Sequence, residues 1–77
     1  MVKVVFYSWN IGARKIPFIK LLHENTKLSL AQAKEVKDSV IDRNEIVEIE
    51  LESEEVAIKI VEESKKLGLN CKIKDHK

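Results

Sequence analysis

The chain is poor in the residues that mark several common classes of protein. Its single cysteine, Cys71, excludes an internal disulfide. Two glycines and one proline are too few for a glycine-rich phosphate-binding loop and allow few tight turns. The sequence contains no signal peptide and no apolar run long enough to span a bilayer. We therefore expect a cytoplasmic protein with short connections between its helices and strands.

An excess of charge of one sign is also missing. Lysine and arginine number 14, aspartate and glutamate 13, and the formal net charge is +1. A dedicated nucleic-acid-binding protein usually carries a marked basic excess. The apolar content is ordinary for a globular chain and too high for a disordered one. Residues 1–77 are therefore expected to form a single domain with an ordered core of about 2–74, near the lower size limit for independent folding.

Residues that carry catalytic or metal chemistry are sparse. His23 and His76 are far apart in the sequence, and neither has a cysteine or carboxylate at the spacing of a metal site. Cys71 has no histidine near it in sequence, so it is expected to be a buried structural thiol. We expect no enzyme activity, no cofactor and no metal site.

The first half of the chain predicts a strand followed by two helices. Residues 2–9 are rich in β-branched and aromatic types, which favour a strand. A helix is expected over 15–24, with Pro17 tolerated in its first turn. Ser29 and Gln32 form a Ser-x-x-Gln capping box that begins the second helix. Four apolar positions then recur at helical spacing, namely Leu30, Ala33, Val36 and Val40.

The second half predicts a strand, a helix and a strand. Residues 45–51 alternate between glutamates and aliphatic residues, which indicates a half-buried strand. Ser53 is expected to cap the third helix, and Gly68 to end it. Residues 70–74 form a short closing strand in which Cys71 and Ile73 face inward.

The order β-α-α-β-α-β predicts the sheet topology. A helical crossover joins the last two strands, so these should be parallel. Placing the first strand between them gives a three-stranded antiparallel sheet of order 2-1-3. With all three helices on one face, the predicted fold is a two-layer α+β sandwich.

One side of the first predicted helix combines apolar and cationic residues. At about 100° per residue, five positions share an arc of roughly 140°. They are Lys15, Ile16, Ile19, Lys20 and His23. Phe18, Leu21 and Leu22 lie on the opposing arc and are expected in the core. Apolar residues among lysines suit an acidic protein partner, although the second helix covering the isoleucines would leave ordinary solvated charges.

The segment 12–34 also carries a recognisable series of residues. Gly12 and Ala13 form a turn, the first helix begins with a Lys-apolar pattern, and the second has a Leu-x-Leu-x-x-Ala-Lys pattern. The residues of the two patterns are Lys15, Ile16, Phe18, Ile19, Lys20, Leu28, Leu30, Ala33 and Lys34. With the βααβαβ order, these features resemble the C-terminal domain of the bacterial large-subunit ribosomal stalk protein. The resemblance covers nearly the whole chain.

The resemblance implies a non-enzymatic protein-protein interaction module that acts in translation. In that family the exposed faces of the first two helices recruit translational GTPases. The role carries over to Lys15, Ile16, Ile19, Lys20 and Lys34, while His23 stands where the family usually has arginine.

Two other functions remain open. One is a small RNA-binding protein that uses a basic face formed by Arg14, Lys15, Lys20, Lys27, Lys34 and Lys37. The other is a protease-adaptor-like protein, because the same superfamily fold serves a small adaptor of a bacterial AAA+ protease. That second analogy rests on the fold alone.

The opposite sheet face predicts a second interface. If Val4 and Phe6 face the helices, three other side chains of the first strand lie on the open face, and charged residues of the outer strands flank them. The predicted surface comprises Val5, Tyr7, Trp9, Glu48, Glu50, Lys72 and Lys74. An aromatic strip between acidic and basic walls would complement itself in a homodimer, or bind a partner. Alternatively, the lysine and glutamate stems fold over the aromatics and leave a monomer.

Overall fold

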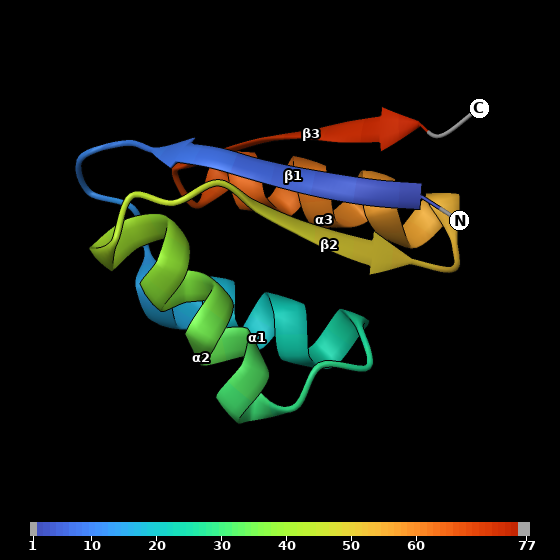
Figure 1. The fold of residues 1–77 in the computed structure, drawn as a ribbon, viewed down its shortest axis with the longest axis horizontal. Coiled ribbons are helices and arrows are strands. Elements are labelled where there is room, and N and C mark those ends of the chain that lie inside the picture. The colour runs from blue at the N-terminus through green and yellow to red at the C-terminus, as the bar shows by residue number, and fades with distance from the viewer. Residues whose placement is uncertain (1, 76–77) are drawn as a thin grey trace.

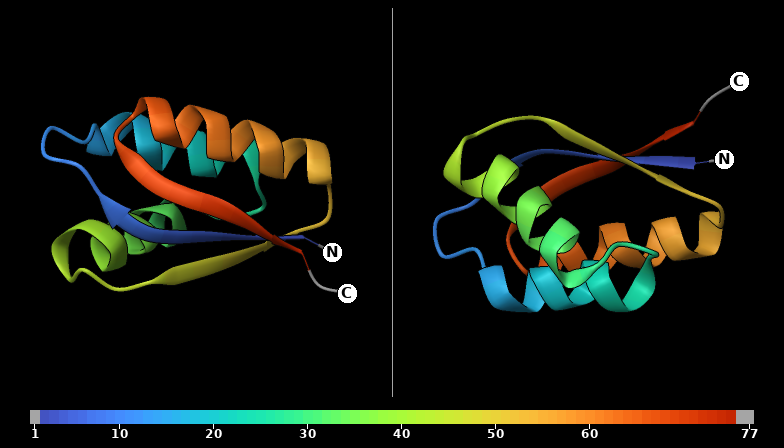
Figure 2. Two further views of the ribbon diagram at one scale, coloured as in Figure 1. Left: turned by 90° about the horizontal axis from the view of Figure 1, so that it is seen from above. Right: turned by 60° about the horizontal axis from the view of Figure 1, so that its bottom comes forward.

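The computed structural model describes residues 2–75, which form one sheet and one layer of helices. Its elements are β1 (Val2–Trp9), α1 (Lys15–Asn25), α2 (Leu30–Lys37), the π-helical turn η1 (Asp38–Asp42), β2 (Val47–Leu51), α3 (Glu54–Lys66) and β3 (Leu69–Asp75). The strand order is β2-β1-β3, and both outer strands are antiparallel to β1 (Figure 1). The three α-helices lie on one side of the sheet (Figure 2). The predicted α+β fold and sheet order are confirmed.

β1 is the central strand, and its alternation places the core. Val4 and Phe6 are fully buried on the helix side. The ring of Phe6 meets that of Phe18 from α1 edge to face, with centroids 5.2 Å apart. On β2 the same alternation buries Ile49 and Leu51 and exposes the glutamates between them, as predicted. The strand begins at Val47, two residues later than expected.

A β-bulge at Tyr7 changes the direction of the end of β1. Phe6 pairs with Cys71 of β3, but the next pairs are Ser8 with Asn70 and Trp9 with Leu69. The extra residue reverses the alternation of side chains. Trp9 therefore packs against the core, and its indole Nε1 donates a hydrogen bond of 2.9 Å to Asn44 Oδ1. The prediction that Trp9 lies on the open sheet face was wrong. It assumed that side chains alternate between the two faces along all of β1, and the bulge interrupts this alternation.

The buried stripe of α1 is rotated from its predicted position. Phe18, Ile19 and Leu22 are buried, whereas Leu21 is only half-buried. Ile19 is 8% exposed and belongs to the core, so its predicted place on the outer face was wrong. The reason is that α1 packs against α2 as well as α3, and the side facing α2 is covered too.

α2 begins as predicted and ends in a different structure. The Ser29 hydroxyl accepts a hydrogen bond from Gln32 N, and the Gln32 side chain accepts one from Ser29 N. The helix continues into η1, which buries Val40 and Ile41. Leu30, although part of the apolar period, remains exposed at the first turn.

Gly68 ends α3 and also contacts the chain just before α1. Its φ is +92°, a left-handed conformation that favours glycine. A Cβ at this position would lie 3.0 Å from the Ala13 Cα. Backbone hydrogen bonds of 2.8 Å join Asn10 N to Gly68 O and Arg14 N to Leu67 O. The end of α3 thus fixes where α1 begins.

Candidate protein-docking surface on the first two helices

α1 and α2 form an antiparallel hairpin that is joined by side chains at both ends. At one end, the His23 Nδ1 lies 3.0 Å from the carbonyl oxygen of Leu28, just before α2. At the other end, Lys15 and Lys37 both reach the Asp42 carboxylate, at 3.9 and 3.2 Å. The start of α1 is therefore next to the end of α2. Figure 2 (right) shows the two helices side by side below the sheet.

Each helix of the hairpin presents one aliphatic side chain to solvent. Ile16 on α1 is 65% exposed, and Leu30 on α2 is 58% exposed. Ile16 was predicted here, but its expected companion Ile19 is buried and cannot contact a partner. Leu30 was predicted only as one of the apolar residues that recur at helical spacing on α2. A signal for its exposure is that it directly follows the Ser29 cap, in the first turn of the helix.

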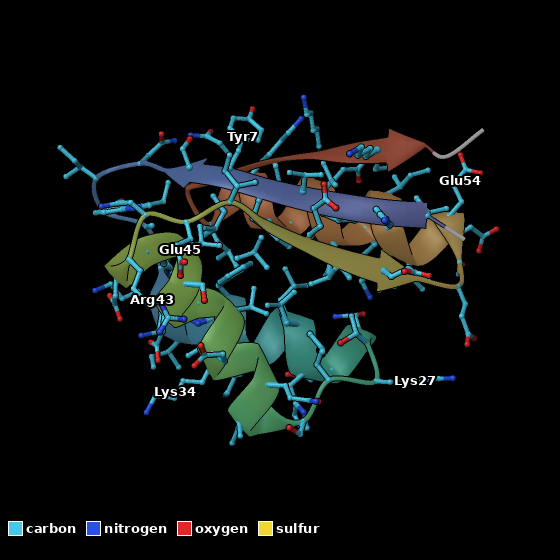
Figure 3. All side chains as sticks on the ribbon, in the orientation of Figure 1. Tyr7, Lys27, Lys34, Arg43, Glu45 and Glu54 are labelled. Carbon is cyan, nitrogen blue, oxygen red and sulfur yellow. The ribbon has the colours of Figure 1, made fainter. Side chains whose placement is uncertain are left out.

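Two lysines of the hairpin are available for a partner. Lys20 and Lys34 are exposed, and among the side chains that the structure describes, those of residues 2–74, no carboxylate oxygen lies within 4.0 Å of either ammonium group. Lys34 points outward from α2 (Figure 3). His23 is exposed as well, beside the chain that enters α2. These side chains make the hairpin surface cationic.

Lys37 has a different role from Lys34. Its ammonium group binds Asp38 and Asp42, and its side chain is largely covered. The hydrogen bond to Asp38 raises the pKa of Lys37, and the same contact lowers the pKa of the Asp38 carboxyl. Lys15 is partly neutralised by Asp42 at 3.9 Å. The carboxylates of η1 therefore neutralise part of the positive charge of the hairpin.

The predicted basic face for RNA is divided by these contacts. Lys27 forms an ion pair of 3.1 Å with Glu52, in addition to the pairs made by Lys15 and Lys37. Of the six basic residues proposed for RNA, half are thus paired with carboxylates in the described chain. A phosphate backbone would have to displace these carboxylates.

The open face of the sheet differs from the predicted aromatic strip. Glu48 and Lys74 form an ion pair of 3.3 Å that crosses β1, and the Lys72 ammonium lies 5.9 Å from the centroid of the Tyr7 ring. Val5, between them, is only 6% exposed although no helix covers it. With Trp9 turned to the core, Tyr7 is the one aromatic side chain left on this face. Acidic residues of β2 and basic residues of β3 thus contact each other across β1. This arrangement matches the alternative prediction, in which lysine and glutamate side chains fold over the central strand.

The groups associated with catalysis are either buried or dispersed. Cys71 is buried on the helix side of β3, and this burial raises the pKa of its thiol to about 11. Among the side chains of residues 2–74, no three histidine, cysteine or acidic groups gather as a metal ion would require. None of the described helices is both long and apolar enough to cross a bilayer. His76 lies outside the described residues.

Comparisons with protein-family models, with curated proteins and with solved structures find no match to this chain.

Proposed function

We propose that this chain is a non-enzymatic protein-binding module whose helix hairpin docks onto an acidic protein surface. The docking surface, called here the hairpin surface, comprises Lys15, Ile16, Lys20, His23, Leu30 and Lys34. The observation that carries the proposal is the exposure of Ile16 and Leu30 beside Lys20 and Lys34, which have no carboxylate partner in the described chain.

In the proposed complex, apolar contacts and charged contacts contribute in different ways. Exposed aliphatic side chains supply affinity when a partner covers them, because each removes apolar area from water. The surrounding lysines attract an acidic surface and raise the rate of encounter. Ile16 lies one helical turn from Lys20, and Leu30 lies one turn from Lys34, so each exposed aliphatic residue of the hairpin has a cation beside it.

For the partner, we propose a translational GTPase. Support comes from the resemblance of residues 12–34 to the ribosomal stalk domain, whose corresponding helices recruit these enzymes. Burial of Ile19 shifts the apolar contribution to Ile16 and Leu30, while Lys15, Lys20 and Lys34 keep the cationic positions of the resemblance. The ion pairs of Lys27 and Lys37, which lie outside the hairpin surface, count against the larger basic face that the RNA alternative requires.

The test is a titration of the isotope-labelled protein with a translational GTPase, followed by NMR. The wild type should show shifts concentrated at α1 and the first turns of α2. The double variant Ile16→Ala/Lys20→Glu should lose more than about tenfold in affinity, since it removes an apolar anchor and reverses one charge.

A matched control lies on α3, where Ile58 and Lys59 are also adjacent and exposed. Ile58→Ala/Lys59→Glu makes the same chemical changes and should leave the affinity unchanged. A wild type without shifts, or equal losses in both variants, would refute the hairpin surface. Steeply salt-dependent retention of RNA that requires Lys20 and Lys34 would instead support the RNA-binding alternative.

A further inference from the structure

The outer edge of β2 is an unpaired strand edge. β2 pairs only with β1, so alternate backbone N–H and C=O groups along Val47–Leu51 point away from the sheet. Within residues 2–75, the backbone hydrogen bonds of loops, turns and caps include none that reaches this edge. The edge can therefore accept another extended chain without displacing an existing strand.

A groove of about 720 Å³ runs beside this edge. Its other walls are the connection between α1 and α2 and the start of α3, and its lining includes Leu28, Ile49, Leu51 and Val56. Figure 1 shows the arrow of β2 above the connection between α1 and α2, and residues of both segments line the groove. The volume lies in the range of sites that enclose a ligand rather than a solvent molecule.

The charge along the edge has one sign. Glu48, Glu50 and Glu52 line the groove from β2 and the residue that follows it, while Lys27 is the one cation in the described lining. Lys27 lies on the opposite wall, in the connection between α1 and α2 (Figure 3), and it pairs with Glu52 at 3.1 Å. Glu48 and Glu50 project to the exposed face of the strand, whereas Ile49 and Leu51 project to the helix side.

We propose that this groove binds an extended peptide segment of another protein, in which apolar and basic residues alternate, as a fourth strand beside β2. Main-chain hydrogen bonds to the free edge would hold the segment, as in other cases of strand addition. Its apolar side chains would face Leu28 and Val56, and its basic side chains would face Glu48 and Glu50. Apolar and basic residues must alternate in the peptide because the side chains of β2 alternate between the two faces of the sheet.

A second copy of this chain fits the edge less well. Pairing two copies of β2 would bring two rows of glutamates together, which is unfavourable. The other edge strand, β3, carries lysines, but α3 packs behind it. A folded copy aligned through β3 would bring that helix toward the position of the α1–α2 connection. A flexible segment avoids this conflict, and the site is separate from the hairpin surface.

The probe for this proposal is the peptide Lys-Val-Lys-Val-Lys-Val-Lys with blocked ends, titrated into the isotope-labelled protein. We expect NMR shifts in β2 and in residues 25–28, together with slower amide hydrogen exchange at alternate residues of β2. A peptide with glutamate in place of every lysine should not bind. A peptide of identical composition with all valines in one block should bind at least about threefold more weakly, because its side chains cannot match both faces.

The protein variant that tests the charge is Glu50→Lys, since Glu50 is exposed and forms no ion pair within the described residues. It should weaken binding by about three- to tenfold. The matched control is Glu62→Lys on α3, which changes the net charge equally and should have no effect beyond a general electrostatic one. Equal binding of the alternating and block peptides, equal losses in both variants, or shifts confined to other surfaces would overturn the proposal.

Discussion

The thiol of Cys71 faces inward from β3 and is 1% exposed, with Sγ 3.6 Å from the carbonyl oxygen of Val61. Burial disfavours the thiolate and raises the pKa of the thiol from 9.0 to about 11. The nearby charge of Lys65 opposes this shift only in part. At neutral pH the group is therefore protonated and inaccessible, and it acts as a small apolar side chain.

The raised pKa of Cys71 predicts a loss of stability in alkaline solution. Between pH 9 and pH 11 the unfolded chain releases a thiol proton that the folded chain retains, so the free energy of unfolding falls as the pH rises. The contribution is about 3 kcal/mol, fully present below pH 9 and lost as the pH passes 11. Urea unfolding of wild type and Cys71→Ala across this range measures the effect, because other titrating groups are common to both proteins. Parallel pH profiles would contradict it.

At the scale of elements, α1 shows how packing sets the orientation of a helix. A helix that touched one neighbour would bury one narrow arc, here Phe18, Leu21 and Leu22. Because α1 contacts α2 and α3 on different sides, the buried arc moves to include Ile19 and leaves Leu21 half-exposed. The outward side then carries Ile16 and Lys20, which form part of the hairpin surface.

This orientation predicts different costs for two substitutions in adjacent turns. Ile19→Ala should destabilise the protein by about 2–4 kcal/mol, because it leaves a cavity in the core. Leu21→Ala should cost about 1 kcal/mol, since its side chain is already partly hydrated. Denaturant unfolding of both variants tests the orientation directly. If Leu21→Ala were the more damaging change, α1 would have the orientation predicted from sequence instead.

At the scale of the whole molecule, one small core joins every element. Buried residues from the sheet, all three helices and η1 form a single cluster, and Phe18 and Phe6 meet at its centre. A chain of 77 residues buries a smaller fraction of its surface than a larger domain. Its total stability is expected to be on the order of 5 kcal/mol.

The loss of one central aromatic ring should therefore cost about as much free energy as the whole fold provides. Phe18→Ala is expected to cost about 3–5 kcal/mol, comparable with the whole stability, and to leave much of the protein unfolded at 25 °C. Phe18→Leu fills most of the volume and should remain folded with a lower melting temperature. Circular dichroism and the dispersion of proton NMR signals distinguish these outcomes. A cooperatively folded Phe18→Ala variant of near-normal stability would show that the core is not a single unit.

Much of the fold was predictable because its signals are local. The capping box of Ser29 and Gln32, the alternation of β2 and the left-handed Gly68 depend on residues within a few positions of each other. The order of elements then leaves few topologies, which is why the sheet order was also predicted. The exposure of the candidate docking residues was predicted in part: Ile16, Lys20, His23 and Lys34 are exposed as expected, while Ile19 is buried and the exposure of Leu30 was not predicted.

Three features of the structure depend on contacts between elements that are distant in sequence. The bulge at Tyr7 arises from the pairing of β1 with β3, and it moves Trp9 from the open face to the core. The position of α2 beside α1 buries Ile19. The ion pair of Glu48 with Lys74 crosses β1 on the open face, where Val5 is only 6% exposed.

Local sequence was thus sufficient for the type and order of the three strands and three α-helices, although not for η1, because hydrogen bonding, capping and side-chain periodicity act over a few residues. The surfaces available to partners were decided only by the packed structure. Exposure depends on which neighbour covers a side chain, and these neighbours come from elsewhere in the chain. The same reason explains the groove beside β2, whose walls are formed by segments that meet only after the chain has folded.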